Sequence, residues 1–213
     1  MERLHSIGGR VVALGDAAYP LGLRDLRDPP AFLCVRGELP RGRTGGEGTA
    51  IVGMRDASAP ALERAFAFAA RVEAPVVSGL ARGIDAAAHR GALAARVPTI
   101  AYVGSGLDLT YPPEHEELQA AILAAGGAIA SERLPGSPVT RWALTRRDRL
   151  QAAHARRAIL VESDEAGGAM HTMRFATELQ RERLACEPRP DGRYDGNARA
   201  IRDGAQPLSW EDM

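Results

Sequence analysis

The chain has 213 residues, a length typical of one domain, and its 27 basic residues are balanced by 27 acidic ones, so net charge gives no argument for a polyanionic partner. Every basic residue is arginine, the better phosphate clamp, although biased genome composition explains this more simply. Two cysteines, Cys34 and Cys186, exclude a disulfide scaffold and are expected to be small core residues. With no signal peptide and no apolar run of about 18 residues, we expect a cytoplasmic protein and no membrane partner.

The first 48 residues are expected to be an N-terminal lead-in and a flexible linker, and residues 49–213 a Rossmann-like domain. Short apolar runs at residues 11–14 and 32–35 predict two strands in the lead-in. Residues 40–48 are rich in glycine and arginine and predict the linker.

Strands and helices are expected to alternate through the remaining chain. Strands are predicted at residues 49–53, 76–77, 99–103, 128–131, 158–162 and 184–186. Helices are predicted at residues 58–72, 84–95, 114–125 and 141–157, from the turn at 165–172 to about 183, and at 198–202, with Ser58 as an N-cap and Glu63 near the capping-box position. The fold class predicted is α/β: a doubly wound, mostly parallel sheet, Rossmann-like, with helices on both faces.

Three glycine-rich turns follow predicted strands. The first, at residues 78–83, opens the helix that carries Asp85 and His89 on one face; Gly104 and Gly106 form the second turn, and Gly168 the third. Free backbone N–H groups at such turns suit an anion, and the carboxyl ends of parallel strands meet at one edge. A phosphate site is therefore predicted there, with a helix-start acid and a surface histidine as the simpler alternative. The dinucleotide fingerprint is absent, which argues against an NAD-type oxidoreductase.

Arginines are expected at the same edge. Arg55 follows the strand at residues 49–53, where an open parallel sheet usually binds its ligand. The predicted helix at residues 141–157 is strongly basic, with Asp148 as the one opposing charge. This helix is either a solvated face or a surface that tracks phosphates.

The motifs V-G-x-R, S-G-L-A-x-G-I-D-x-x-A-H, G-x-G-L-D-x-x-Y-P, S-E, R-x-R and G-G-x-x-x-T occur in this order within residues 19–205. This series resembles the DprA/Smf family of DNA-processing proteins. The resemblance implies a Rossmann-like domain that binds single-stranded DNA, forms homodimers and assists loading of the RecA recombinase in natural transformation. It also implies no catalytic residue, no metal and no cofactor.

Position by position, the resemblance implies DNA- or phosphate-binding roles for a defined set of residues. These are Arg55, Ser78, Gly79, Gly83, Asp85, His89, Gly104, Gly106, Arg141, Arg147, Arg149, Gly168 and Thr172. The chain departs from the family pattern with Leu144 at an aromatic position, Asp148 at the asparagine of R-N-R and Gly167 at the first serine of S-G-S. It is therefore expected to be a divergent, minimal member.

Three functions follow from these residues. Single-stranded DNA binding is favoured, with Arg55→Ala and Arg147→Ala each expected to weaken binding without unfolding the protein. The alternative is a small nucleotide or nucleoside phosphate in the same pocket, as a sensor or hydrolase, which the carboxylates Asp85, Asp108, Glu132 and Glu162 motivate. A protein-interaction scaffold stays open as a third.

Overall fold

The lead-in adds two strands to the main sheet. The computed structural model describes residues 2–39, 47–190 and 192–210. The first of these ranges contains α1 (Glu2–Ser6), β1 (Gly9–Ala13), the 3-10 helix η1 (Leu21–Asp25) and β2 (Phe32–Gly37). β1 pairs antiparallel with β2, and β2 pairs antiparallel with β6. The predicted linker at 40–48 falls mostly outside the described residues.

The rest of the chain alternates strands and helices as predicted. Its elements are β3 (Thr49–Val52), α2 (Ala59–Arg71), β4 (Val76–Ser78), α3 (Ile84–Ala94), β5 (Thr99–Tyr102), η2 (Pro113–His115), α4 (Glu116–Ala124), β6 (Ala128–Ser131), α5 (Arg141–His154), β7 (Arg157–Leu160), α6 (Ala169–Glu178), β8 (Glu182–Cys186), α7 (Asp195–Arg202) and β9 (Gln206–Leu208). None of the helices in the described ranges has the length and apolar character that crossing a bilayer requires.

The strand order contains one reversal. The described residues form one sheet in the order β1-β2-β6-β5-β4-β3-β7-β8-β9, and the strands from β6 to β9 in this order are parallel. From β3 the chain builds outward through β4 and β5 to β6, then returns through α5 and places β7 on the other side of β3. The predicted doubly wound α/β fold is confirmed, and the crevice at its switch point lies beyond the carboxyl ends of β3 and β7.

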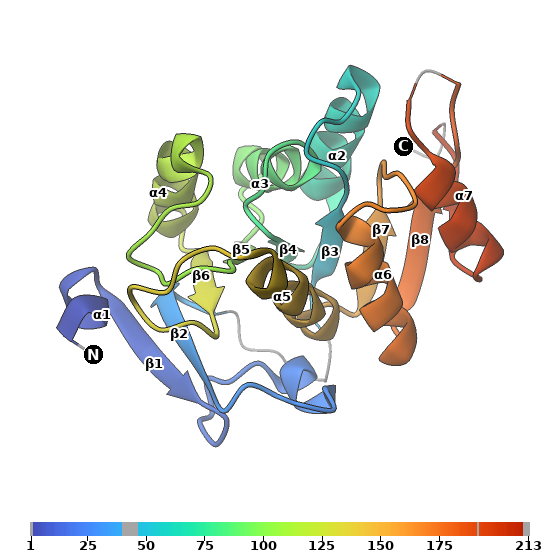
Figure 1. Cartoon of the computed structure of the whole chain (residues 1–213). Helices are drawn as coiled ribbons and strands as arrows, with labels where there is room; N and C mark the ends of the chain where they lie inside the picture. Colours follow the sequence, from blue (N-terminus) through green and yellow to red (C-terminus); the bar gives the residue numbers. More distant parts are fainter. Residues whose placement is uncertain (1, 40–46, 191, 211–213) are drawn as a thin grey trace.

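Helices cover both faces of the sheet. Figure 1 shows α2, α3 and α4 on one side and α5 and α6 on the other. Successive side chains of a strand point to opposite faces of the sheet and pack in different cores. Ala50 and Val52 pack in the cluster that includes Leu150 of α5, while Ile51 packs in the cluster that includes Ala65 of α2. Both cysteines are buried, as predicted.

Three local predictions were wrong. The predicted helix from the turn at residues 165–172 reaches about residue 183, but α6 ends at Glu178, and Gln180 has a φ of 54° before β8 begins. β9 was not predicted. Ser58 precedes α2, yet it forms no side-chain cap; its hydroxyl and amide both donate to Glu162 Oε2, at 2.8 and 2.7 Å. Glu162 therefore ties the loop after β3 to the loop after β7, at the switch point.

Candidate functional site

A cavity of about 550 Å³ opens at the switch point. Four segments supply most of its wall: residues 52–56 at the end of β3 and beyond it, Ala81 and Asp85 around the start of α3, one face of α5, and residues 164–172 around the start of α6. This is the crevice in which open parallel sheets bind ligands. The cavity is therefore the candidate site.

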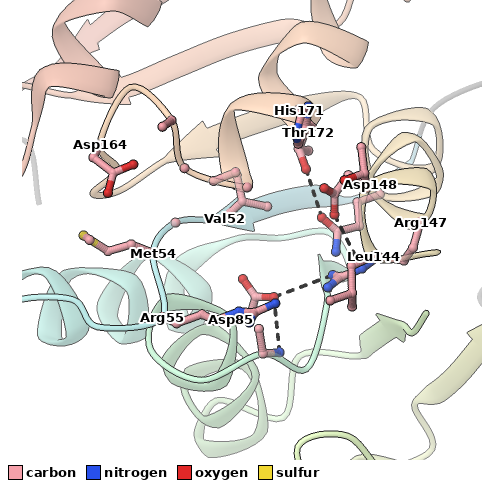
Figure 2. A pocket seen from close by; sticks show the side chains of 18 of the residues that line it. Val52, Met54, Arg55, Asp85, Leu144, Arg147, Asp148, Asp164, His171 and Thr172 are labelled. Carbon is pink, nitrogen blue, oxygen red and sulfur yellow. Dashed lines mark hydrogen bonds and ion pairs between the residues drawn. The ribbon is translucent and has the colours of Figure 1, made fainter. Parts of the chain in front are cut away.

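Arg147 is the central side chain of the cavity wall. It is 6% exposed, and its Nη1 lies 3.7 Å from Asp85 Oδ2 while its Nε lies 3.5 Å from Asp148 Oδ1. With its amide nitrogen facing Thr172, Gln151 accepts from Arg147 and, at 3.2 Å, from the Gly79 amide. Figure 2 shows Arg147 reaching from α5 to Asp85 on α3. Arg147 is thus held by the fold, and its charge is shared by two carboxylates.

The first glycine turn does not offer the free amides that the sequence predicted. The amides of Gly79 and Ala81 donate to Asp85 Oδ2 at 3.1 and 3.3 Å, so the protein's own carboxylate takes the place expected for an anion. Burial raises the pKa of Asp85, while Arg147 and these amides lower it. That part of the prediction is wrong, because the helix-start acid turns back into its own turn.

The glycines of this turn allow close packing within the chain. A Cβ on Gly79 would lie 1.3 Å from Arg147 Nη1. Gly83 has a φ of +71°, and a Cβ there would lie 2.3 Å from the carbonyl oxygen of Met54. Since Met54 precedes Arg55, Gly83 lets the turn press against the loop that carries Arg55.

Two predicted site residues lie in the core, away from the cavity. The Ser78 hydroxyl donates to the Ile51 carbonyl at 2.7 Å. His89 is fully buried, its Nδ1 lies 2.7 Å from Thr99 Oγ1, and burial lowers its pKa to about 3. Neither the phosphate role nor the surface alternative for His89 agrees with this placement, because the side chain is packed against β5.

Arg149 also lies away from the cavity. It is 2% exposed and forms an ion pair with Glu132. Residues two apart on a helix project about 200° from each other, so Arg147 and Arg149 occupy opposite sides of α5. The R-x-R spacing was interpreted as two phosphate contacts, but it gives one buried arginine on each side of the helix.

The second glycine turn borders the site without lining the main cavity. Gly104 lines a small adjoining hollow that shares Arg55, Leu144 and Arg147 with the cavity. The Gly106 amide donates to the Ser137 carbonyl at 3.0 Å. This turn therefore supports the loop after β6.

The carboxylates that suggested acid–base chemistry are used by the fold. Asp108 accepts from the Gly136 amide at 2.8 Å, and Glu132 pairs with Arg149. Glu162 accepts from Ser58 and from the amide of Arg193, and Asp85 accepts from its own turn. Within the described residues, no group of three or more acidic, histidine or cysteine side chains is placed to hold a metal.

Exposed arginines surround the cavity mouth. Arg55 and Arg141 line the cavity, are exposed and have no ion-pair partner in the described part of the chain. Arg193 lines it too and donates to the Asp56 carbonyl at 2.9 Å. Gly168 stands at the start of α6, where an added Cβ would meet no atom within 4 Å. Three arginines thus stand around the mouth together with Asp56 and Asp164, beside a helix N-terminus.

Several cavity residues escaped the sequence analysis as site residues. Gln151, Asp164, His171 and Arg193 all line the cavity. Position i+4 from Arg147 on the same helix face could have identified Gln151. Arg193 lies in a loop between β8 and α7, and no motif in the sequence marks it. The sequence also predicts Thr172, and its buried hydroxyl oxygen accepts a hydrogen bond from the Gln151 amide nitrogen at 3.2 Å.

Fold and site together define an α/β protein with an arginine-rimmed, phosphate-compatible cavity at a sheet switch point. Residues 10–213 match the family model for DNA recombination-mediator protein A, and the chain belongs to this family. The resemblance to DprA/Smf proteins is therefore confirmed.

Curated relatives and solved structures agree with this assignment. The chain is 34% identical over 204 residues to protein Smf of Synechocystis, covering 93% of this chain and 51% of that protein. It is 33% identical over 200 residues to DprA of Streptococcus pneumoniae, covering 90% of this chain and 68% of that protein. The crystal structure of the pneumococcal protein matches with a TM-score of 0.85, at 29% identity, over 98% of this chain and 75% of that one.

A second solved relative is DprA of Helicobacter pylori, whose structure is described in terms of a single-stranded DNA binding mode. It matches with a TM-score of 0.79, at 26% identity, over 93% of this chain and 90% of that one. This chain spans about half the length of the Synechocystis relative.

Proposed function

We propose that this chain binds single-stranded DNA in DNA processing for recombination. The observation that supports this most is the pair of exposed arginines, Arg55 and Arg141, without acidic partners in the described ranges at the mouth of a 550 Å³ cavity. Arginine binds phosphate through a planar fork of donors, and releasing the phosphates' counterions drives association.

Each part of the mouth has a defined task in this proposal. Arg55 and Arg141 contact successive phosphates, and Arg193, partly held by Asp56, provides a third contact. The start of α6 at Gly168 faces the strand with its backbone N–H groups. Arg147 is too buried for a phosphate contact, so it shapes the wall.

The test is a titration of a fluorescently labelled oligonucleotide at several salt concentrations. Three phosphate contacts predict a slope of log K against log salt of about −2, because each contact on a single strand contributes about −0.7. Arg55→Ala and Arg141→Ala each weaken binding and make this slope shallower by about 0.7. Arg71→Ala, at the exposed end of α2, is the matched control and leaves both unchanged. Absence of binding at low salt overturns the proposal.

We also propose the finer roles that belong to the family resemblance. The chain acts without catalysis, as a homodimer in the cytoplasm, and assists loading of the RecA recombinase onto single strands in natural transformation. Light scattering tests the dimer. Filament assembly by RecA on coated single strands, with and without this chain, tests the loading.

A small nucleotide is a second candidate ligand, which the cavity volume favours. Ligand pockets usually measure about 300–1,000 Å³, so 550 Å³ suffices for one nucleotide. Native mass spectrometry of the purified chain would reveal a co-purified nucleotide as an added mass.

A further inference from the structure

Asp148 is a nearly buried carboxylate with an ion-pair contact to Arg147 but no hydrogen bond from the described part of the chain. It is 9% exposed and lines the cavity, and no hydrogen bond to its side chain occurs in the described part of the chain. Its closest cation is Arg147, whose Nε lies 3.5 Å from Oδ1. Asp85, by contrast, accepts two backbone amides. Asp148 therefore presents free acceptor oxygens to whatever enters.

The cations around Asp148 compensate its charge only in part. Arg147 is the cation nearest to both Asp148 and Asp85, so one guanidinium serves two carboxylates. Arg55, across the cavity on the loop after β3, also acts on Asp148 electrostatically. A nearly buried acceptor without a hydrogen-bond donor is costly, and a ligand that brings N–H groups reduces that cost.

We propose that Asp148 reads a guanine base inserted into the cavity, accepting its N1–H and its N2 amino group with the two carboxylate oxygens. Guanine is the one standard base whose Watson–Crick edge places two donors side by side. Adenine, cytosine and thymine each put an acceptor next to a donor, and that acceptor would face a carboxylate oxygen. This assignment rests on the proposed function, which it deepens by naming the preferred nucleotide.

The surroundings of Asp148 suit such a nucleotide. Leu144, one turn earlier on α5, and Met54 line the same cavity and offer apolar contact to the base (Figure 2). The exposed Arg55 and Arg141 at the mouth then meet the phosphates on either side of the inserted nucleotide. Reading a base that has left its stack through its Watson–Crick edge is an established strategy of nucleic-acid-binding proteins.

The experiment measures affinities for thymidine oligonucleotides that carry one central variable base, at pH 8. A central guanine binds about tenfold more tightly than a central thymine, the range expected of a bidentate contact to a base. Inosine, which lacks the N2 amino group, binds with intermediate affinity. Asp148→Asn loses the guanine preference and shifts it toward adenine, because an amide offers one donor and one acceptor.

Controls separate this inference from the proposed function. Glu63→Gln changes an exposed carboxylate on α2, outside the cavity, and keeps the guanine preference. Thermal unfolding verifies that Asp148→Asn is folded, and free GMP as a competitor distinguishes a guanine in a strand from a free nucleotide. If no oligonucleotide binds, the proposed function fails. If all oligonucleotides bind equally, or if Asp148→Asn keeps the preference for guanine, only the role of Asp148 fails.

Discussion

The guanidinium of Arg147 occupies the space that any side chain on Gly79 would need. A Cβ on Gly79 would lie 1.3 Å from Arg147 Nη1, and the Gly79 amide donates to Asp85, the ion-pair partner of Arg147. The turn after β4 and the helix α5 are thus joined by three residues that depend on one another.

Replacing Gly79 with alanine is expected to disrupt this joint. Arg147 is enclosed and cannot move aside freely, so Gly79→Ala lowers the free energy of unfolding by about 3 kcal/mol and abolishes oligonucleotide binding. Urea denaturation measures the loss. Gly168→Ala, where an added methyl group meets no atom within 4 Å, is the matched control and changes stability by less than about 0.5 kcal/mol. Equal stability of the two variants would contradict this account.

Arg147→Ala is expected to lower the stability of the protein, whereas Arg141→Ala is expected to weaken DNA binding and leave stability nearly unchanged. Removing Arg147 leaves Asp85 and Asp148 without their shared cation and costs about 3–5 kcal/mol of stability. Removing the exposed Arg141 leaves stability within about 0.5 kcal/mol and weakens DNA binding. This revises the sequence-based expectation that Arg147→Ala weakens binding without unfolding. Adding Asp148→Asn to Arg147→Ala should recover part of the lost stability, and strictly additive effects would exclude the coupling.

Asp148 is expected to make stability depend on pH. Burial is the main cause that raises its pKa from 3.8 to about 7, with Arg147 opposing and Asp85 adding to the rise. The folded state then holds a proton that the unfolded chain releases, so stability contributed by this group falls as the pH rises from about 4 to 7. Asp148→Asn therefore stabilises the protein above pH 7 by more than about 1 kcal/mol, and the gain disappears near pH 4. Urea denaturation at pH 8 and pH 4.5 measures both values; a gain that is equal at both would refute the shift.

The same titration should act oppositely on two features of DNA binding. Protonating Asp148 removes a negative charge from the cavity, so affinity for a plain thymidine strand rises as the pH falls through about 7. The preference for guanine decreases in the same interval, because a protonated carboxyl no longer accepts two hydrogen bonds. Oligonucleotide titrations at pH 6 and 8 measure both trends, and Asp148→Asn should show neither.

Two buried histidines are expected to stay neutral far below their usual range. Burial lowers the pKa of His89 to about 3 and that of His154 to about 4, and His154 Nδ1 lies 2.8 Å from the Tyr102 hydroxyl. The unfolded chain protonates both near pH 6.5, so their stabilising effect is complete above that pH and is lost as the pH falls toward 4. Proton NMR should show two histidine rings that do not titrate between pH 8 and 5. An Asp148→Asn background removes the opposing effect of the aspartate from the stability measurement.

The sheet could be predicted because its strands are short apolar runs separated by glycine turns. Buried parallel strands such as β5 and β6 need apolar residues on both faces, and that pattern is visible without any contact information. The end of α6 could not be predicted, because residues 169–183 have helical propensity throughout while pairing with β7 draws residues from Glu182 onward into β8. β9 is short and mostly exposed, and only its pairing with β8 defines it.

The convergence of several candidate residues on one cavity could be predicted, but the hydrogen bonds and ion pairs of their side chains could not. Arg55, Asp85, Arg141, Arg147, Gly168 and Thr172 come together as expected around one cavity. Whether an amide or an arginine is free depends on its partners in the fold: Asp85 accepts the Gly79 amide, and Glu132 pairs with Arg149. The sequence shows Asp148 as an acidic residue within a basic helix. That no hydrogen-bond donor of the described chain reaches its carboxylate is visible only in the structure.

The switch point places β3 beside β7, and these two strands are separated by more than a hundred residues of chain. During synthesis, Arg55 therefore leaves the ribosome long before the cavity residues of α5 and α6. If the cavity binds DNA as proposed, a nascent chain cannot do so until β7 and α6 have packed against β3, so ligand binding becomes a late event of maturation. Because the cavity includes residues from both sides of the switch point, bound DNA should stabilise the strands on both sides against unfolding.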